Sequence, residues 1–284
     1  MNIIAKRIAA LLAAILLLVA SAGAEEMNVL LIGLDTADDQ GRSDTMLLAR
    51  IQPQEGTVQL VSFLRDLYVP IPGHGSNRLN AAYFYGGEEL LCQTLSQAFD
   101  VSIHRWATVH FSTLKWLVDE LGGVTLEVSE AEQKQMNQLL RASGGAPLAQ
   151  SGTQLLNGSQ ALAYSRIRKQ DSDFHRTRRQ QALLLAMLPP MSRKGPFALA
   201  QMAITLMGQI DTNLTLTDLA TLFPLLSRLD SLTIQTAQVP FSGAYQDATV
   251  NGMMVLNPDL KTNRRLLREF WEGRMIVSPA NDLP

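Results

Sequence analysis

Residues 28–34 read NVLLIGL, and residues 45–51 read TMLLARI. Each run is apolar and of strand length, which predicts a β-strand. Helix-like spacing of apolar residues follows at residues 87–99 and at residues 111–121, where a Gly-Gly pair predicts the helix end. Further strands are predicted at 58–63, 105–111, 124–128 and 232–238, and further helices at 197–210, 216–229 and 259–272. Strands that alternate with amphipathic helices indicate an α/β domain with helices on both faces of a sheet.

The composition fits a folded domain and excludes several other classes of protein. The chain has 284 residues, of which 46% are hydrophobic and 18% are charged, and this balance excludes disordered and low-complexity chains. Its 24 basic residues are outnumbered by 26 acidic ones, which gives a net charge of −2. A globally basic nucleic-acid binder is therefore disfavoured, and we expect no nucleic-acid partner. Cys92 is the single cysteine, so no intramolecular disulfide can form.

The N-terminus carries a targeting or anchoring segment. Two basic residues precede an uninterrupted stretch of apolar and small residues at 8–24, and two glutamates follow it. This order of charges predicts that residues 27–284 form an exported domain outside the cytoplasm. Residues 1–26 are interpreted as a single membrane anchor or as a cleaved signal peptide, because the apolar stretch is short for a span and residues 22–24 fit a cleavage site. A buried core helix, the remaining alternative, is disfavoured by the flanking charges.

Two aspartates stand where predicted strands meet a loop. Asp35 follows the strand at residues 28–34, and Asp44 precedes the strand at residues 45–51. Open α/β sheets place their ligands where strands give way to loops. Two carboxylates brought together there could hold Mg²⁺, which takes a few hard oxygen ligands together with phosphate oxygens. A solvated turn is the alternative, since Asp and Gly are ordinary turn residues.

Arginines are concentrated in two further places. Arg65 follows a predicted strand, and six basic residues lie within a later fourteen-residue stretch. Arg166 and Arg168 would point the same way on an extended backbone, whereas Arg176 and Arg179 would share one face of a helix. Guanidinium groups in such pairs fit an anion with several phosphate oxygens. The alternatives are a solvated basic helix face and, for Arg65, an ordinary ion pair with the next residue.

Other catalytic templates do not occur in the sequence. The four histidines lack metal-ligand spacing, and there is neither a nucleophile elbow nor a Walker motif. Cys92 falls on the apolar side of a predicted helix and is interpreted as a packed thiol. Trp106, Trp116, Tyr83, Phe84 and Tyr85 are interpreted as core residues, with the lining of an apolar cleft as the alternative for some of them.

Several motifs occur together in a defined order. They are NVLLIGLD (28–35), RSDTMLL (42–48), SFLRDLYVPIPGHGSNRLNAAYFYGG (62–87), LVDELGGVTLEV (117–128), LNGSQALAYSRIRK (156–169) and DFHRTRRQ (173–180). Over residues 28–180 the chain thus resembles the LytR-CpsA-Psr family of cell-wall assembly proteins. The resemblance implies a three-layer α-β-α sandwich, with a central mixed sheet and an apolar cleft for a polyprenyl chain. It also implies a Mg²⁺-assisted phosphotransferase that moves a glycopolymer, such as teichoic acid or capsular polysaccharide, from a polyprenyl-pyrophosphate carrier to peptidoglycan. The implied partners are this lipid-linked donor, the peptidoglycan acceptor and membrane lipid.

The resemblance also assigns roles to individual residues. Asp35 and Asp44 match the metal-associated carboxylates, and Asp44 and Arg65 are the implied catalytic residues. Either aspartate could act as the base for the acceptor hydroxyl, and Asp44 is favoured. The implied pyrophosphate-binding residues are Arg65 of the SxPRD motif, Arg166 and Arg168 of YxRxR, and Arg176, Arg179 and Gln180 of GRxxRQ. Leu64 replaces the usual proline before Arg65, which we expect to loosen the backbone that aims this arginine. His175 replaces the usual glycine of GRxxRQ and puts a side chain where glycine permits close approach.

Other functions stay open on the sequence alone. A non-catalytic binder of polyprenyl lipid or wall polymer would use the same cleft and arginines without turnover. A polyprenyl pyrophosphatase would use water in place of the acceptor hydroxyl. A transcription attenuator is disfavoured by the export segment and by the acidic exported domain.

Overall fold

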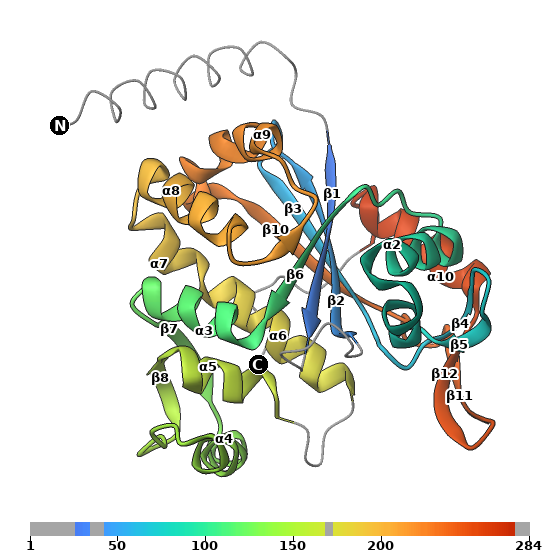
Figure 1. The fold of residues 1–284 in the computed structure, drawn as a ribbon, viewed down its shortest axis with the longest axis horizontal. Coiled ribbons are helices and arrows are strands. Elements are labelled where there is room, and N and C mark those ends of the chain that lie inside the picture. Colours follow the sequence, from blue (N-terminus) through green and yellow to red (C-terminus); the bar gives the residue numbers. More distant parts are fainter. Residues whose placement is uncertain (1–25, 35–42, 168–172, 276–284) are drawn as a thin grey trace.

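The computed structural model describes residues 26–34, 43–167 and 173–275. Its centre is a six-stranded sheet with the strand order β10-β3-β2-β1-β6-β9 (Figure 1). These strands are β1 (Met27–Leu34), β2 (Ser43–Gln52), β3 (Thr57–Phe63), β6 (Arg105–His110), β9 (Asp211–Thr212) and β10 (Thr233–Val239). β1 is parallel to β6 and β10 is parallel to β3, whereas β2 is antiparallel to both of its neighbours. The expected mixed central sheet is therefore confirmed.

The carboxyl ends of four strands meet at one edge of this sheet. Leu34, at the end of β1, pairs with His110 of β6 and with Ser43 of β2. Val239 of β10 likewise pairs with Phe63, at the end of β3. The side of the sheet at which β2 begins is therefore the side at which four other strands end, namely β1, β3, β6 and β10. We call this the carboxyl edge, and we call the opposite edge, where β1 starts, the amino edge.

Helices cover both faces of the sheet, so the structure has three layers (Figure 1). α2 (Asn80–Phe99) and α10 (Leu260–Trp271) cover one face. The other face carries α3 (Phe111–Glu120), α5 (Gly158–Ser165), α6 (Asp173–Ala186), α7 (Leu188–Ser192), α8 (Pro196–Met207), α9 (Leu216–Leu226) and the 3₁₀ turn η1 (Leu229–Ser231). Successive side chains of β1 point to opposite faces of the sheet and so contribute to the cores on both sides. Leu30 packs in the core under α2 and α10, while Leu31 packs towards Leu184 of α6. The expected three-layer sandwich is confirmed.

A second hydrophobic core lies beside the sheet. β7 (Val124–Val128) and β8 (Gly152–Leu156) form a separate antiparallel pair, and α4 (Glu130–Ser143) packs beside them. Val124, Met136 and Leu156 are fully buried in this core. The strand predicted at residues 124–128 is therefore present, but it does not belong to the central sheet.

Two further hairpins were not predicted from the sequence. β4 (Tyr68–Ile71) pairs with β5 (Gly75–Arg78), and β11 (Tyr245–Val250) pairs with β12 (Met253–Pro258). The second turn contains Asn251 with φ 50° and Gly252 with φ 77°. An Asn-Gly pair with positive φ at both positions is the usual two-residue hairpin turn, so the sequence did contain a signal for it.

α2 begins seven residues before the predicted start, at Asn80, and non-helical backbone at Gly86 and Gly87 interrupts it. Tyr83 is buried as expected, but Phe84 is 56% exposed and Tyr85 is 40% exposed. The interpretation of these two aromatic residues as core is wrong, because they lie on the outer side of the first helical segment.

Within the described ranges, no helix combines the length and the apolar character needed to cross a bilayer. Apart from Glu26, residues 1–26 lie outside these ranges, so the anchor or signal peptide stays a prediction.

Candidate active site

Arg65 lies at the carboxyl edge, directly after β3, on a backbone that is held by hydrogen bonds. The Leu64 N–H donates to the Val239 carbonyl at 2.9 Å, and the Asn80 N–H donates to the Arg65 carbonyl at 3.2 Å. A proline at position 64 would have no N–H to donate. The expectation that Leu64 loosens this backbone is therefore wrong, since the leucine ties the end of β3 to the end of β10.

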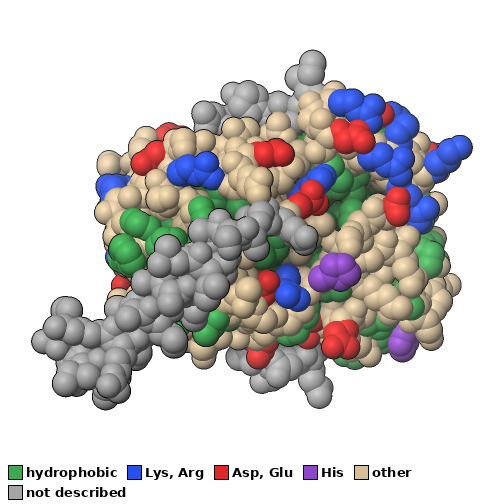
Figure 2. Space-filling view, turned by 90° about the horizontal axis from the view of Figure 1, so that it is seen from above, with side chains coloured by type: hydrophobic (Ala, Val, Ile, Leu, Met, Phe, Trp, Pro, Cys, Tyr) green, Lys and Arg blue, Asp and Glu red, His purple; other side chains and the backbone are tan. Residues whose placement is uncertain are grey.

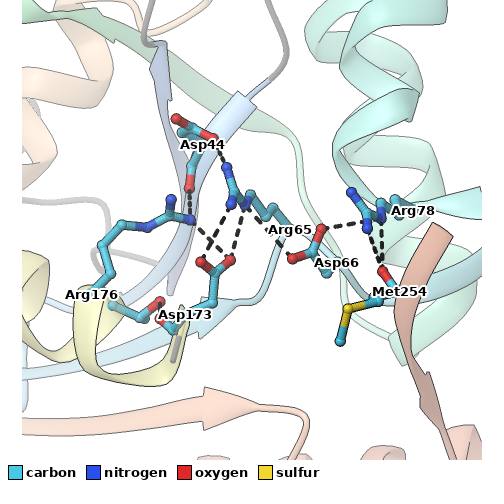
Figure 3. Close-up of polar contacts among 8 residues, drawn as sticks. Asp44, Arg65, Asp66, Arg78, Asp173, Arg176 and Met254 are labelled. Carbon is cyan, nitrogen blue, oxygen red and sulfur yellow. Dashed lines mark hydrogen bonds and ion pairs between the residues drawn. The ribbon is translucent and has the colours of Figure 1, made fainter. Parts of the chain in front are cut away.

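The Arg65 side chain joins residues from two other elements (Figure 3). Its Nη1 donates to Asp44 Oδ1 at 2.6 Å, and its Nε donates to Asp173 Oδ2 at 2.9 Å. Arg176 Nη2 donates to the same Asp173 oxygen at 3.1 Å and to the Asp44 carbonyl at 3.3 Å. Asp44 lies at the start of β2, whereas Asp173 and Arg176 lie on the first turn of α6. We call Asp44, Arg65, Asp173 and Arg176 the arginine–aspartate network.

Asp173 is the member of this network that was not predicted from the sequence. It accepts hydrogen bonds from both arginines, and its place in the first turn of a helix favours a carboxylate. Its spacing of three residues from Arg176 was the available signal, because residues three apart in a helix are neighbours. Burial alone would lower the pKa of Arg65, but the charges of Asp173 and Asp44 outweigh it and raise that pKa. The Arg65 guanidinium therefore stays charged.

A neighbouring ion pair connects the network to the β11–β12 hairpin (Figure 3). Arg78 Nε lies 3.3 Å from Asp66 Oδ1 and donates to the Met254 carbonyl at 3.1 Å. Burial raises the pKa of Asp66, and the charge of Asp173 adds to this rise, although Arg65 and Arg78 oppose it. Asp66 thus faces both the network and the hairpin.

A cavity of about 140 Å³ opens beside the network, between the sheet and α6. β2 contributes Asp44 and then Leu47 to its wall, while α6 contributes Arg176, Gln180 and then Leu184. The two elements run side by side, because Arg176 bonds to the Asp44 carbonyl and Leu184 packs in one cluster with Leu47. The cavity is therefore charged at the carboxyl edge and apolar towards the middle of the sheet, and the expected apolar cleft is present.

Arg166 and Gln180 both line the cavity. Arg166 directly follows α5 with φ −101° and ψ 1°, and its guanidinium lies 4.6 Å from the ring centre of Phe111. This backbone is not extended, so the condition under which Arg166 and Arg168 would point the same way is not met at Arg166. Arg168 itself lies outside the described residues.

Arg179 takes a different position from Arg176, although both side chains are buried. It donates to the Ile167 carbonyl at 3.1 Å and lies 3.5 Å from a Glu132 carboxylate oxygen. Arg176 is among the residues that line the cavity, whereas Arg179 is not, and Arg65 reaches the cavity only through its hydrogen bond to Asp44. A pyrophosphate contact of Arg179 stays a prediction.

Asp44 is the one carboxylate among the described residues that line the cavity. The described part of the chain contains no group of three or more His, Cys, Asp or Glu side chains that could hold a metal ion. Mg²⁺ that also binds substrate phosphates needs only one or two protein carboxylates, so Asp44 at the charged end is compatible with such a site. Asp35 lies outside the described residues, and Mg²⁺ binding stays a prediction.

Comparison with known proteins gives consistent matches over most of the chain. A model of the LytR_cpsA_psr family matches residues 15–269. The polyisoprenyl-teichoic acid–peptidoglycan teichoic acid transferase TagT of Bacillus subtilis (strain 168) is 34% identical over 217 residues, which cover 74% of this chain and 67% of TagT. The chain spans about two thirds or less of the length of the teichoic acid transferases that it matches.

Two solved structures share the fold. TagT bound to LIIa-WTA superimposes with a TM-score of 0.73 and 29% identity, covering 90% of this chain and 92% of that one. The LytR-CPS2A-psr family protein YwtF (TagT) with bound octaprenyl pyrophosphate lipid superimposes with a TM-score of 0.67 and 28% identity, covering 87% and 90% of the two chains.

Proposed function

Because this chain belongs to the LytR_cpsA_psr family, we propose that it transfers a glycopolymer from a polyprenyl-pyrophosphate carrier to peptidoglycan. Its relative TagT is named for the transfer of teichoic acid to peptidoglycan, and a TagT structure contains octaprenyl pyrophosphate. The proposed donor is therefore teichoic acid or a similar glycopolymer, such as a capsular polysaccharide, on the same kind of lipid.

The observation that carries this proposal is that one cavity is lined by apolar side chains at one end and by charged side chains at the other. A polyprenyl pyrophosphate joins an apolar chain to a multiply charged anion. The cavity offers Leu31, Leu47 and Leu184 at one end, and Arg176 with Asp44 at the other. The guanidinium groups of Arg65 and Arg176 already engage carboxylates. Phosphate oxygens accept hydrogen bonds from the same donors, so a bound pyrophosphate would take over these contacts.

The proposed reaction forms one bond to phosphorus and breaks another. An acceptor hydroxyl oxygen attacks the phosphorus that carries the glycan, and the bond from that phosphorus to the bridging oxygen breaks. Polyprenyl phosphate leaves with the bridging oxygen, and the hydroxyl proton passes to the Asp44 carboxylate. Arg65 and Arg176 neutralise the charge that develops on the leaving phosphate.

Mg²⁺ is proposed to assist from the same end of the cavity, held by Asp44 together with Asp35. When bound, Mg²⁺ supplies positive charge to the phosphate oxygens. Mn²⁺ titration monitored by electron paramagnetic resonance tests this part separately. Asp44→Asn should weaken Mn²⁺ binding, and unchanged binding would remove Asp44 from the metal site.

The proposed location is the outer side of the cell membrane, with residues 1–26 as the anchor. The order of charges around residues 8–24 supports this orientation. Proteolysis of intact cells with an antibody to the domain tests the location. A cleaved signal peptide would instead release the domain into the medium.

A transfer assay tests the reaction itself. The full chain is incubated with a polyprenyl-pyrophosphate-linked glycan, nascent peptidoglycan chains and Mg²⁺, and covalent glycan on peptidoglycan is measured. Arg176→Ala should reduce transfer by at least 10²-fold, the scale for losing a charge-stabilising group in a transition state. Arg178→Ala is the matched control, because Arg178 lies on the same helix but is exposed.

Each outcome of this assay separates one function from another. Glycan on peptidoglycan that is lost in Arg176→Ala and kept in Arg178→Ala supports the transferase. Released glycan phosphate without peptidoglycan product would indicate a pyrophosphatase. Tight donor binding without either product would indicate a non-catalytic binding protein.

A further inference from the structure

α8 and α9 present apolar side chains to solvent. Phe197 is 77% exposed, Ile204 is 43% exposed and Leu216 is 61% exposed. The Phe197 ring packs edge-on against Phe223 of α9, with 5.8 Å between the ring centres. The two helices therefore pack against each other, and we call their exposed side the α8–α9 face. Contiguous exposed apolar surface of this kind marks an interaction site.

This face is almost without charge. Residues 196–227 include two charged residues, Asp211 and Asp218, where the 18% average of the chain would give about six in 32 positions. Asp218 is buried and accepts a hydrogen bond from Arg105 at 2.8 Å. A pair of helices that faced only water would carry more charge.

The α8–α9 face lies at the amino edge of the sheet. Asp218, near the start of α9, pairs with the first residue of β6. Arg228, just after α9, donates to the Pro53 carbonyl in the turn between β2 and β3 at 2.6 Å. α9 thus crosses the amino edge, beside the start of β1 (Figure 1).

A basic surface lies on the other side of the same edge. Residues 260–274 contain five basic and two acidic residues, so the segment keeps a net positive charge. Several of its arginines already have partners, because Arg265 and Arg274 pair with the glutamates of the segment and Arg268 pairs with Asp100. The end of α10 reaches the start of β1, because Arg50 lies over the Trp271 ring at 5.6 Å and also pairs with Glu26. Figure 2, which views the molecule from this end, shows Lys and Arg side chains gathered on the side of α10 and hydrophobic side chains on the opposite side.

We propose that the amino edge rests on an anionic phospholipid bilayer, with the α8–α9 face inserted into its interface and the basic end of α10 against lipid headgroups. Apolar and basic side chains on one side of a protein are the combination that binds such a surface. The sequence supports the same orientation, because only two residues separate the apolar stretch at residues 8–24 from Met27, the start of β1. The inference rests on the proposed membrane location and is independent of the transfer chemistry.

This orientation has a consequence for the cavity. β1 has eight residues, which at about 3.3 Å per residue separate the two edges by about 26 Å. The carboxyl edge, with Arg65 and Asp44, then faces away from the bilayer. The apolar part of the cavity, at Leu31 and Leu184, then lies between this charged end and the membrane.

Depth-dependent quenching of a single fluorescent label tests the proposal in the full chain. The protein is reconstituted into vesicles of phosphatidylglycerol and phosphatidylethanolamine, with the environment-sensitive dye NBD on Ile204→Cys or, separately, on Leu216→Cys. Cys92 is buried and does not compete for the dye. The matched control is Leu155→Cys, which is 66% exposed on β8 at the far side of the molecule.

Quenching by spin-labelled lipid should be several-fold stronger at positions 204 and 216 than at position 155. Adding Phe197→Asp should reduce quenching at both positions without changing the thermal midpoint, because Phe197 is mostly exposed. Equal quenching at all three positions, or none at 204 and 216, would overturn the proposal. Fluorescence at 204 that depends on protein concentration but not on spin-labelled lipid would show that a second copy of the chain covers the face instead.

Discussion

Asp173→Asn should destabilise the ligand-free protein and strengthen the binding of pyrophosphate. In the structure Asp173 accepts hydrogen bonds from Arg65 at 2.9 Å and from Arg176 at 3.1 Å. Asparagine keeps the shape of the side chain but removes its negative charge. The two arginines then lose a partner in the empty site, while an incoming anion no longer meets a carboxylate there.

The geometry sets the size of both effects. Hydrogen bonds to charged groups contribute about 1.5–3 kcal/mol each, but asparagine retains one acceptor oxygen, and Arg65 retains Asp44. The side chain of Asp173 is also 21% exposed, so we expect a loss of about 2 kcal/mol, or about 4–8 °C in melting temperature for a domain of this size. The repulsion between the Asp173 carboxylate and a phosphate about 5 Å away would be about 3 kcal/mol at an effective dielectric constant of 20. Screening by solvent reduces this repulsion to about 1 kcal/mol. Pyrophosphate should therefore bind about fivefold more tightly.

Thermal unfolding in detergent, with and without inorganic pyrophosphate, measures both effects in one experiment. The control variant is Asp247→Asn, since Asp247 is exposed on β11 and its substitution should leave both measurements unchanged. If Asp173→Asn has the same melting temperature as the wild type, the arginine–aspartate network does not stabilise the protein. A variant that melts lower but gains less from pyrophosphate than the wild type would show that Asp173 orients the arginines for the anion rather than competing with it.

Three other substitutions or measurements test single residues. Gly158→Ala should lower the melting temperature strongly, because a Cβ at this position would lie 2.2 Å from a backbone carbonyl oxygen of α3. Burial alone would raise the pKa of Asp218, but hydrogen bonds from Thr215 and the pair with Arg105 hold it below its ordinary value. This carboxylate therefore stabilises the fold above the ordinary pKa of Asp and loses the effect as pH falls through its lowered pKa, so the loss of stability in Asp218→Asn at neutral pH should shrink in acid. Burial raises the pKa of Cys92 to about 12, so its reaction with a disulfide reagent should be far slower in the native protein than in the unfolded chain.

The central strands were predictable because each is an apolar run with few alternatives. Residues 28–34 and 45–51 occupy the middle of the sheet, as β1 and β2. The sequence could not assign residues 124–128 to a sheet, because a short alternating strand suits any sheet with one buried face. The β4–β5 and β11–β12 hairpins were missed because their strands have only four to six residues each, although the turn at Asn251 and Gly252 was recognisable.

The candidate site was predictable where it depends on strand ends, and less so where it depends on side-chain direction. Asp44 and Arg65 meet because β2 starts at the edge where β3 ends. Arg176 reaches the same place from α6. Spacing could not show that Arg179 turns towards Ile167 and Glu132, because which buried partner a long side chain takes depends on the elements packed around it.

The arginine–aspartate network explains why acidic residues occur inside the most basic part of the sequence. Arg176 is 4% exposed, and a buried guanidinium without a partner would be strongly destabilising. Asp173 supplies that partner in the ligand-free protein, as Asp44 does for Arg65. The sequence left two interpretations of Arg65 open, an ion pair with the next residue and an anion site. The structure shows Arg65 paired with Asp44 and Asp173 and 3.8 Å from Asp66, so ion pairing and anion binding are two states of the same guanidinium. The carboxylates hold the Arg176 guanidinium at the charged end of the cavity and the Arg65 guanidinium beside it, so the arginines need little rearrangement to bind an anion.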